Sequence, residues 1–574
     1  MSARELITEH LDLWTGAVTK KSSSGRGSNG KVELTGVKRL RELILSLAVR
    51  GKLVPQNSEG PSAASLLVDI EAKKKELYHA KIVKKPKKLC QPQSDEAPWP
   101  LPSSWEWVKL PDIYYPISPS GKKLKSSETL DIGQFPVVDQ GQSYISGYTD
   151  DASLVIEIPH PVIVFGDHTT ARKYIDFSFV PGADGTKILC PILVNPRFFY
   201  LQLLGYDLEN RGYARHFKVL NENFFALPPL EEQHRIVQKV DELMALCDRL
   251  EQQTSDQLEA HETLVDTLLG SLLRNAEGSL TQSENATELA DNWARLAAHF
   301  DTLFTTEQSI DKLKQTILQL AVMGRLVEQD AGDELATNLL TQIHTRKMAL
   351  AGEKRIKRPR PLTQLDETQH SYPAPANWVW ASFEDIADEI STGPFGSMIH
   401  KHDYVENGTP LVNPSHMVSG GIKEDSSVSV TPAKAEELSS YKLAKGDIVM
   451  ARRGEVGRCA IVTDRESGWL CGTGSFVLRF HSAINRRFIL LLFSTDTVRD
   501  YLTGNSVGTT MTNLNHGILK KMPVALPSTE EQYRIVQKVD ELMALCDQLK
   551  ERLNRASETR CQLAAAVVEG AVKR

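Results

Sequence analysis

Two loop segments in the last third of the chain carry side chains that could contact a nucleic acid. Arg452 and Arg453 follow a predicted strand and precede Gly454, so their guanidinium groups would project from a tight loop. Arginine forks read guanine edges, and threonine, asparagine and histidine contact bases or phosphates. A structural arginine pair and a plain polar loop are the alternatives. The predicted DNA contacts of this half are Ser397, His400, Arg452, Arg453, Thr509, Thr510, Thr512 and Asn513.

An earlier part of the chain offers the same residue types in two further segments. Residues 166–177 read GDHTTARKYIDF and residues 211–220 read RGYARHFKVL. The predicted DNA contacts here are Thr169, Thr170, Arg172, Lys173, Arg211, Tyr213, Arg215 and His216. Solvated loops are the alternative for these segments, and also for the loop histidines His168, His400 and His402.

Residues that could catalyse a reaction on DNA are not recognisable in the sequence. Methyltransferases that act on adenine grip the flipped base with an Asn/Asp-Pro-Pro-Tyr/Phe loop. The nearest string is Asn195–Phe199, NPRFF, where Arg197 replaces the second proline, and we interpret it as a strand-to-helix turn. No GxxxxGK[ST] phosphate loop, HExxH motif or Cys/His zinc spacing is present. We therefore expect no catalytic residue and no metal site.

Composition indicates a cytoplasmic protein of several domains. The chain has 574 residues, too many for one core, and no apolar stretch of membrane-spanning length. Its N-terminus lacks the apolar region of a secretory signal. Among the seven cysteines, Cys247 and Cys546 occupy core-like helix positions, and we expect reduced, buried thiols. The net charge of −6 argues mildly against nucleic-acid binding by bulk electrostatics, so local patches or a partner must supply positive surface.

The elements that must position these residues include a helix that occurs twice. Residues 231–248, EEQHRIVQKVDELMALCD, return as residues 530–547 and differ only at His234/Tyr533. A match of this length indicates an internal duplication. Identical patches related by a pseudo-twofold would bind two copies of one partner. The alternative is that the two copies only pack against each other.

The duplication extends to the segments that precede each helix. Residues 37–56, VKRLRELILSLAVRGKLVPQ, match residues 310–329 at a constant offset of 273 positions. The basic segments 81–89 and 354–362 match as well, and so do the two Trp-x-Trp pairs at Trp105/Trp107 and Trp378/Trp380. The basic segments could contact phosphates or an acidic partner, or they could be plain solvated linkers. Upstream, we expect an amphipathic helix over residues 2–21 and a Gly/Ser linker over residues 22–30.

Between each Trp-x-Trp and the following long helix, the sequence predicts a mixed, mostly β domain. Residues 105–226 and 378–526 are rich in glycine, proline and threonine and contain short β-type runs separated by turn signals. These runs are residues 161–165, 187–194, 447–451, 459–463 and 475–480. The two domains are far less alike than the helices, which suggests one architecture that reads two targets.

The long helices are predicted over about residues 231–274 and 530–572. Their apolar residues repeat every four and three positions, as in a coiled coil. The predicted seam of the first helix is Ile236, Val240, Leu243, Cys247, Leu250, Leu258, Val265, Leu268 and Leu272. That of the second is Ile535, Val539, Leu542, Cys546, Leu549, Leu553, Leu563 and Val567. Packed antiparallel, such rods would hold two β-rich domains in fixed orientation.

With its two variable domains and two repeated helical regions, each long helix starting at Pro-x-x-EEQ-x-RIV, the chain resembles the specificity subunit of type I restriction–modification enzymes. The long N-terminal region with RELILSLAVRGKLVPQ resembles the B family of large specificity subunits. Residues 393–397 (GPFGS), 446–457 (GDIVMARRGEVG) and 510–515 (TMTNLN) resemble landmarks of its recognition domains. The first variable domain departs from that pattern.

The resemblance implies a non-catalytic subunit that directs the chemistry of its partners. Each target recognition domain would read one half of a bipartite double-stranded DNA site. The helices would set the spacing and dock two methyltransferase (modification) subunits, to which restriction (translocase) subunits would join. S-adenosylmethionine, ATP and Mg are expected on those partners and not on this chain. The predicted docking residues lie on the face left free by the seam: Gln238, Lys239, Gln537 and Lys538.

The predicted fold class is α+β, with two recognition domains joined by two long antiparallel coiled-coil helices in a pseudo-twofold repeat. The expected divisions are 1–104 (helical region and basic linker), 105–228 (first recognition domain), 229–275 (long helix), 276–377 (second helical region and linker), 378–527 (second recognition domain) and 528–574 (long helix). A stand-alone DNA-binding scaffold or regulator without enzyme partners is the alternative function.

Overall fold

The structure is a computed structural model. It describes residues 8–20, 32–57, 60–83, 97–119, 121–182, 185–208, 215–273, 282–362, 365, 370–395, 398–504 and 514–573. The chain forms two compact units, residues 1–257 with 556–574, and residues 258–555. Within the described ranges no helix combines the length and the apolar composition of a membrane span.

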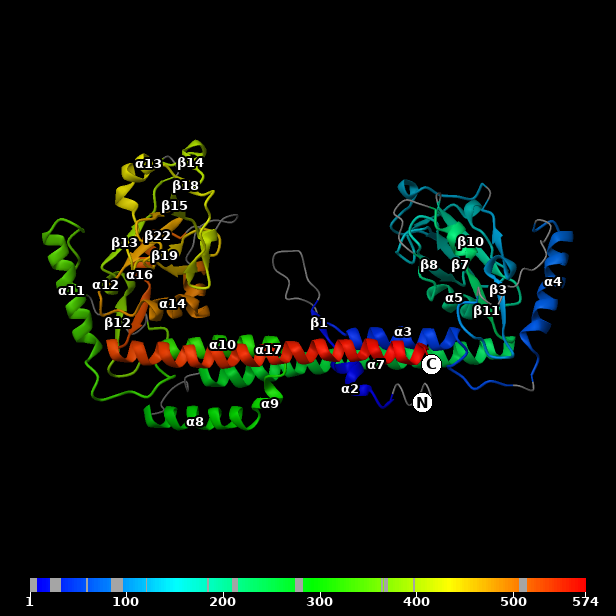
Figure 1. Ribbon diagram of the computed structural model, residues 1–574, viewed down its shortest axis with the longest axis horizontal. Coiled ribbons are helices and arrows are strands. Elements are labelled where there is room, and N and C mark those ends of the chain that lie inside the picture. The colour runs from blue at the N-terminus through cyan, green and yellow to red at the C-terminus, as the bar shows by residue number, and fades with distance from the viewer. Residues whose placement is uncertain are drawn as a thin grey trace. The chain divides into compact units, whose positions relative to one another are not determined.

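The first unit combines a helical base with a β-rich recognition domain (Figure 1). Its own helices are α2 (Leu11–Gly16), α3 (Thr35–Val49), α4 (Ala63–His79), α5 (Pro196–Leu204) and α6 (Phe217–Glu222), with short 3-10 helices at Leu110–Asp112, Ser126–Glu128 and Ala152–Leu154. The base also contains the first part of α7 (Leu230–Leu273) and the last part of α17 (Thr529–Lys573). Leu40, Ile236 and Ala564 share one buried core, so three separate chain segments build this base.

The recognition domain of this unit starts and ends beside α7. Strand β3 (Glu106–Lys109) pairs antiparallel with β11 (Phe224–Leu227), directly before the helix begins. A four-stranded antiparallel sheet has the order β4 (Tyr114–Ile117), β10 (Thr186–Pro191), β7 (Val162–Gly166), β8 (Arg172–Ile175). A three-stranded sheet has the order β6 (Gly147–Thr149), β5 (Phe135–Val138), β9 (Val180–Pro181), in which β5 and β9 are parallel.

The second unit repeats this plan with its own segments. Its base contains α8 (Gln282–Ala298), α9 (Phe300–Leu303), α10 (Glu307–Val322), α11 (Ala336–Gly352), the last part of α7 and the first part of α17. Strand β12 (Val379–Ser382) pairs with β23 (Pro523–Leu526) directly before α17. The remaining helices are α12 (Phe383–Ile386), α13 (Pro432–Glu437), α14 (Arg486–Ser494), α15 (Asp496–Gly504) and α16 (His516–Lys521), with 3-10 helices at Lys401–Asp403, Pro414–His416 and Ser439–Tyr441.

The two recognition domains share a topology although their sequences differ. The second has an antiparallel sheet ordered β13 (Glu389–Thr392), β22 (Ser475–Arg479), β19 (Ile448–Ala451), β20 (Cys459–Ile461). Its other sheet has the order β14 (Tyr404–Val405), β18 (Ser429–Val430), β15 (Thr409–Val412), β21 (Leu470–Cys471), with β15 and β21 parallel, beside the hairpin β16 (Met417–Val418) and β17 (Gly421–Ile422). The prediction of two mixed domains of similar topology is confirmed.

The helices preceding each recognition domain end in the same way. Gly51 and Gly324 have φ of +69° and +71°, the left-handed conformation that glycine adopts freely. A Cβ at Gly51 would lie 2.6 Å from Pro102 Cγ, and one at Gly324 would lie 2.5 Å from Pro375 Cγ. Glycine therefore lets the turn after each helix pack against the segment that leads into the Trp-x-Trp.

The helix predicted over residues 2–21 lies only partly within the described residues, which begin at residue 8. There, α2 spans Leu11–Gly16, and the helix does not continue to residue 21, because Thr19–Lys20 forms strand β1, paired with β2 (Val32–Glu33). The cause is the contact of Trp14, whose carbonyl oxygen would lie 2.2 Å from a Cβ at Gly36, while the Gly36 N–H donates to the Ala17 carbonyl oxygen. The chain must turn back at this point. The predicted Gly/Ser linker lies outside the described residues.

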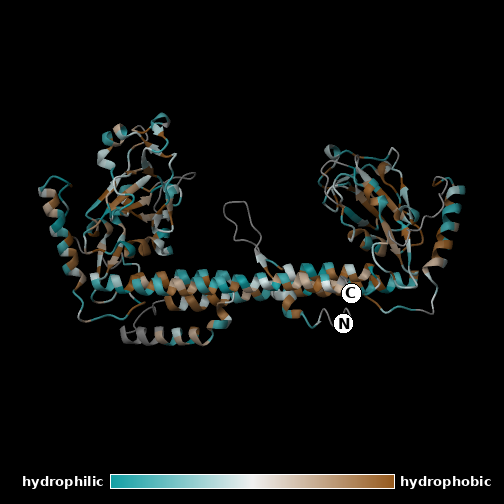
Figure 2. Cartoon of the chain, in the orientation of Figure 1, coloured by the Kyte–Doolittle hydropathy of each residue, from teal (hydrophilic) through white to brown (hydrophobic). Residues whose placement is uncertain are grey.

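The predicted seam is mostly buried in the first long helix, whereas in the second most of its positions are partly buried or exposed. Ile236, Val240 and Cys247 are buried in the first unit, and Ile535, Val539 and Cys546 in the second, where both cysteines are free thiols. The predicted positions Leu268 and Leu563 are displaced by one residue, because Leu269 and Ala564 are the buried ones and Leu563 is 52% exposed. In each helix the burial pattern thus drifts from a strict seven-residue repeat, as a straight α-helix does. Figure 2 shows hydrophobic and hydrophilic residues interspersed along both helices.

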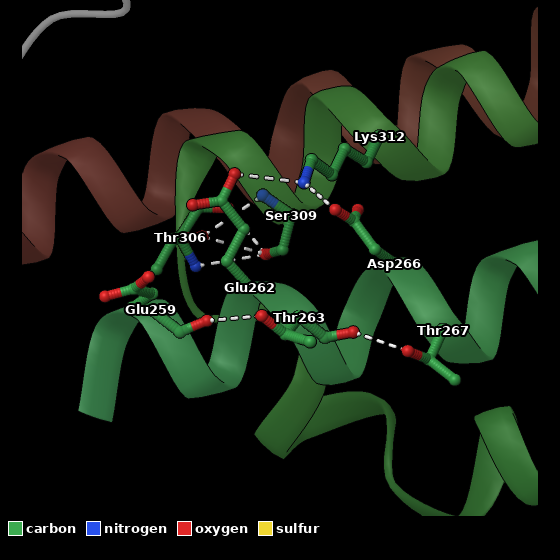
Figure 3. Close-up of polar contacts among 8 residues, drawn as sticks. All are labelled: Glu259, Glu262, Thr263, Asp266, Thr267, Thr306, Ser309 and Lys312. Atoms are coloured by element: carbon green, nitrogen blue, oxygen red, sulfur yellow. Dashed lines mark hydrogen bonds and ion pairs between the residues drawn. The ribbon is translucent and has the colours of Figure 1, made fainter. Parts of the chain in front are cut away.

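An ion-pair clamp ties α10 to the last part of α7 in the second unit (Figure 3). Lys312 Nζ lies 3.0 Å from Glu262 Oε1 and 2.5 Å from Asp266 Oδ2. Thr306 caps α10, accepting from the Ser309 N–H at 3.1 Å. In the first unit the equivalent residue of Lys312 is Arg39, which pairs with Glu42 of its own helix. The repeat is therefore not fully symmetric in its surface contacts.

Candidate nucleic-acid interface

In the first unit, three loops meet at the end of the antiparallel sheet. They are the β5–β6 loop with Asp139 and Gln140, the β7–β8 turn with residues 167–170, and the segment before β10 with Gly185. The Thr169 hydroxyl donates to the Gln140 carbonyl oxygen, and the His168 N–H donates to Gln140 Oε1 at 3.2 Å. The Asp167 N–H donates to the Gly185 carbonyl oxygen at 2.8 Å. These bonds fix a polar rim made from separate parts of the chain.

Asp167 is the residue on which this rim depends. It is 4% exposed, and its carboxylate accepts the Phe217 N–H at 2.9 Å and lies 3.7 Å from Lys187 Nζ. Its carbonyl oxygen accepts the His216 N–H at 2.8 Å. Asp167 was not among the predicted residues, although it directly follows Gly166 at the end of β7. It joins the β7–β8 turn to the start of α6.

Three predicted DNA-contacting side chains of the first unit instead bond to other parts of the chain. Lys173 is 4% exposed, its Nζ donates to the Asp139 carbonyl oxygen at 2.9 Å, and burial lowers its pKa although Asp139 opposes that effect. His216 is 1% exposed, with Nδ1 3.0 Å from the Asp167 carbonyl oxygen. Arg172 donates to the carbonyl oxygens of Leu204 and Tyr206. In this structure Lys173, His216 and Arg172 support the loops, and direct DNA contact by them stays a prediction.

The remaining candidates of this unit lie at the rim. Thr169 and Thr170 are half-buried in the β7–β8 turn, and Thr170 has a φ of +58°. Arg215 is exposed immediately before α6. Gln142, which the sequence analysis did not select, is exposed on the neighbouring loop, with Nε2 3.4 Å from the Thr169 carbonyl oxygen. A glutamine amide can pair with an adenine edge, so Gln142 joins Thr169, Thr170 and Arg215 as a candidate.

In the second unit, the β19–β20 turn carries the two predicted arginines. The Arg452 N–H donates to the Gly474 carbonyl oxygen at 3.0 Å, and its guanidinium lies 5.4 Å from the Phe476 ring centroid. Burial and the charge of Arg453 lower the pKa of Arg452. Arg453 is exposed on the same turn, next to Gly454 with φ of +74°. The turn thus holds one arginine against the sheet and presents the other to solvent.

The other candidates of this unit are less defined. His400 is exposed, its ring centroid is 5.4 Å from that of His402, and its N–H donates to the Asp403 carboxylate at 2.7 Å. The predicted contacts Arg211, Tyr213, Ser397, Thr509, Thr510, Thr512 and Asn513 lie outside the described residues.

A cleft of about 760 Å³ lies behind the β19–β20 turn, between it and helices α14 and α15. Its arginines are already neutralised by nearby carboxylates: Arg458 by Glu455, Arg487 by Asp540 and Arg499 by Asp496. The cleft therefore offers little net positive charge to an anion. The described residues also contain no cluster of three or more His, Cys, Asp or Glu side chains arranged to hold a metal ion.

The NPRFF string forms a helix start, as predicted. The Asn195 side chain caps α5 by accepting the Arg197 and Phe198 N–H groups at 2.9 and 3.2 Å. Asn485 caps α14 in the same way. The string is thus a structural joint, and its chemistry is helix capping.

The repeated Glu-Glu-Gln triplet locks each long helix to this joint. Gln233 and Gln532 are fully buried. Gln233 Oε1 accepts the Asn195 N–H at 2.8 Å, and Nε2 donates to the Pro228 carbonyl oxygen at 2.9 Å. Gln532 repeats both bonds, with the Asn485 N–H at 2.8 Å and the Pro527 carbonyl oxygen at 3.1 Å. The glutamine fixes the direction in which the helix leaves the recognition domain.

The preceding glutamate of each triplet joins the long helix to the segment that follows the shorter repeated helix. Glu232 accepts from Gln56 Nε2 at 2.6 Å. Glu531 accepts from Gln329 Nε2 at 2.6 Å and from Trp378 Nε1 at 2.8 Å. Burial raises the pKa of both carboxyls, against the effect of these hydrogen bonds. The sequence analysis treated this triplet as a family signature and missed its structural role.

The predicted docking residues lie on the outer side of the long helices. Gln238 and Gln537 are exposed. Lys239 pairs with Glu242 at 2.9 Å, and Lys538 pairs with Glu541 at 3.0 Å. Two leucines outside the core follow on the same side: Leu246 is 37% exposed and Leu545 is 53% exposed. Each unit therefore presents the same surface of the repeated segment to solvent.

Comparison with known proteins agrees with this architecture. Residues 102–260 and 377–557 match the family model described as the type I restriction modification DNA specificity domain. The chain is 33% identical over 616 residues to the Escherichia coli type I restriction enzyme EcoEI specificity subunit and 33% identical over 612 residues to its EcoAI counterpart, with full coverage of all chains. The HsdS subunit from Thermoanaerobacter tengcongensis covers 83% of this chain, and the match spans 98% of that structure, at 15% identity and a TM-score of 0.38. The chain belongs to the family of type I restriction–modification DNA specificity subunits.

Proposed function

We propose that this chain selects the DNA sequence on which a type I restriction–modification complex acts. Each recognition domain reads one half of a bipartite site, and the repeated helices set the spacing between the halves. The chain itself is non-catalytic. It directs adenine methylation by two methyltransferase subunits and, when restriction subunits join, cleavage.

The observation that carries this proposal is that the two units share their architecture but differ in the loop residues at the ends of their sheets. Both units repeat the sheet order, the helix cap and the buried glutamine lock. Their rims differ: threonines, Gln142 and Arg215 in one, and Arg453 in the other. Side chains of these types read base edges, and two different sets on one frame suit two different half-sites.

The partners are proposed from the family and from the outer face of the repeated segment. Two equivalent patches on one chain suit two copies of one partner. We propose two methyltransferase subunits there, which bind S-adenosylmethionine, with ATP and Mg bound by the restriction subunits. The partners would supply the positive surface that a net charge of −6 leaves scarce.

Co-expression with the cognate methyltransferase subunit, in a host free of adenine methylation, tests this function. Genome-wide methylation mapping should yield one bipartite motif, which the methyltransferase alone should not produce. The charge reversals K239E and K538E should weaken co-purification without altering the melting temperature of the chain. A full methylation pattern without this chain would refute the proposal.

A further inference from the structure

The two docking faces carry nearly the same sequence but different free charges. We define the docking stripe as the residues three or four apart along the outer side: Arg235, Lys239, Glu242, Leu246 and Arg249 in the first unit, and Arg534, Lys538, Glu541, Leu545 and Gln548 in the second. Spacing of three and four residues places each set on one helix face.

In the second unit the first arginine of the stripe is already bound. Arg534 Nη1 lies 2.9 Å from Asp333 Oδ1, and Nη2 lies 2.7 Å from Oδ2. Asp333 is 5% exposed and also accepts from the Ser528 hydroxyl at 3.2 Å. A bidentate pair of this kind leaves the guanidinium little capacity for another carboxylate.

In the first unit the same arginine has no such counterpart. Asp333 corresponds to Gly60 at the repeat offset of 273 positions, so no carboxylate stands at that point. Arg235 is exposed and has no ion pair or hydrogen bond through its side chain in the described part of the chain. Its charge acts on the Glu232 carboxyl, as that of Arg534 acts on Glu531, so this interaction does not distinguish the two units. Its stripe neighbours Lys239 and Glu242 neutralise each other.

The far end of the stripe differs in the same direction. Arg249 is exposed and, among the described residues, lacks an ionic partner, whereas Gln548 stands at that position in the second unit. Two guanidinium groups that lack an ion pair within the described residues therefore distinguish the first stripe from the second. The nearby cation Lys550 of the second unit is bound to Asp311 at 2.7 Å.

We infer that the two docking faces bind the same partner with unequal affinity, the first unit more tightly. The occupant is a methyltransferase subunit whose docking surface presents carboxylates to Arg235 and Arg249. This inference rests on the proposed function, which supplies two copies of one partner. Since the copies are identical, the carboxylates that meet Arg235 and Arg249 in one unit meet a neutralised arginine and a glutamine in the other. The complex would assemble in two distinct steps, and the first unit would be occupied first.

One sequence difference favours partner binding by the second unit instead. His234 is replaced by Tyr533, which is 58% exposed and adds apolar surface beside the second stripe. Tyrosine is favoured at protein interfaces. The charge difference should prevail because two ion pairs at an interface rim change affinity by roughly two- to thirtyfold, while Tyr533 lies beside the stripe and not on it.

Titration of the full chain with the purified cognate methyltransferase subunit tests the inference, with native mass spectrometry to count the steps and calorimetry to measure them. Wild type should bind two copies in steps whose affinities differ by roughly two- to thirtyfold after the statistical factor. The R235Q/R249Q double variant should weaken the tighter step to the level of the other. Q548R should strengthen the weaker step, and Y533H should leave the order unchanged. All changes are on exposed surface, and circular dichroism melts check the fold.

Two equal steps in wild type, or a tighter step that survives R235Q/R249Q, would overturn the inference while leaving the proposed function intact. Absence of any binding would instead count against the proposed function. If R235Q/R249Q lowers the affinity of the isolated chain for DNA and leaves both partner steps unchanged, the arginines contact phosphates and the inference fails.

Discussion

The buried glutamine at the entry of each long helix should be among the most costly polar residues to replace. Gln532→Leu keeps the side chain close in size but removes the acceptor of the Asn485 N–H and the donor to the Pro527 carbonyl oxygen. A buried backbone group that loses its hydrogen-bond partner costs about 1–3 kcal/mol. Two such groups give about 2–6 kcal/mol, reduced somewhat by the apolar leucine.

Hydrogen exchange of the full-length protein measures this loss locally. In Q532L, peptides covering the start of α14 should exchange about 30-fold faster or more, because the Asn485 amide and the helix entry lose their anchor. The first unit should be unaffected. Q233L should show the reverse, with faster exchange at the start of α5 only.

A matched control is available on the same helix. Gln537 is exposed, and Q537L should change stability by less than about 0.5 kcal/mol. If Q532L exchanges like wild type, or if its effect equals that of Q537L, the glutamine lock does not hold the helix and the reasoning from unsatisfied groups is refuted.

Three further changes have defined outcomes. The raised pKa of Glu531 means that its neutral form is favoured in the folded state. Its contribution to stability is therefore fully present below the usual value of 4.5 and is lost as pH rises through the folded pKa. In urea unfolding, E531Q should be less destabilising relative to wild type at pH 8 than at pH 5, and a difference that stays constant with pH would contradict this. K312M should lower stability by about 0.5–1.5 kcal/mol at low salt and by little in 1 M NaCl, whereas R39M in the first unit should cost less; equal costs in a thermal shift assay would exclude the clamp. R453A should reduce methylation in vivo and relax one base position of the half-site read by the second domain, and an unchanged motif would remove Arg453 from the interface.

Much of the frame could be predicted from the sequence because its signals are local. The repeated helices, the strands at residues 161–165 and 475–480 and the helix cap at Asn195 all follow from periodicity, β-propensity and capping chemistry. The one-residue displacement of the seam to Leu269 and Ala564 was harder to predict, because a four-three pattern extended along a long helix drifts away from the buried side.

The surroundings of the predicted DNA contacts could not be predicted as well, because exposure depends on tertiary contacts. Lys173 and Arg172 have the charge expected of DNA-binding residues, but Asp139 and the carbonyl oxygens of Leu204 and Tyr206 occupy them. Gln142 carries no charge and stands in no motif, so only the fold brings it beside Thr169. The unequal docking stripes were partly hidden. Arg249 and Gln548 differ in the sequence itself, but Arg235 and Arg534 lie in matching sequence, and only the fold pairs Arg534 with Asp333.

The central claim is that each recognition domain reads its own half of the site while the repeated frame sets the spacing. Exchanging residues 105–226 for the corresponding domain of another specificity subunit, followed by genome-wide methylation mapping, tests it most directly. One half of the motif should change, and the other half and the spacer should stay the same. A chimera that folds and binds its methyltransferase but changes both halves, or neither, would contradict the account.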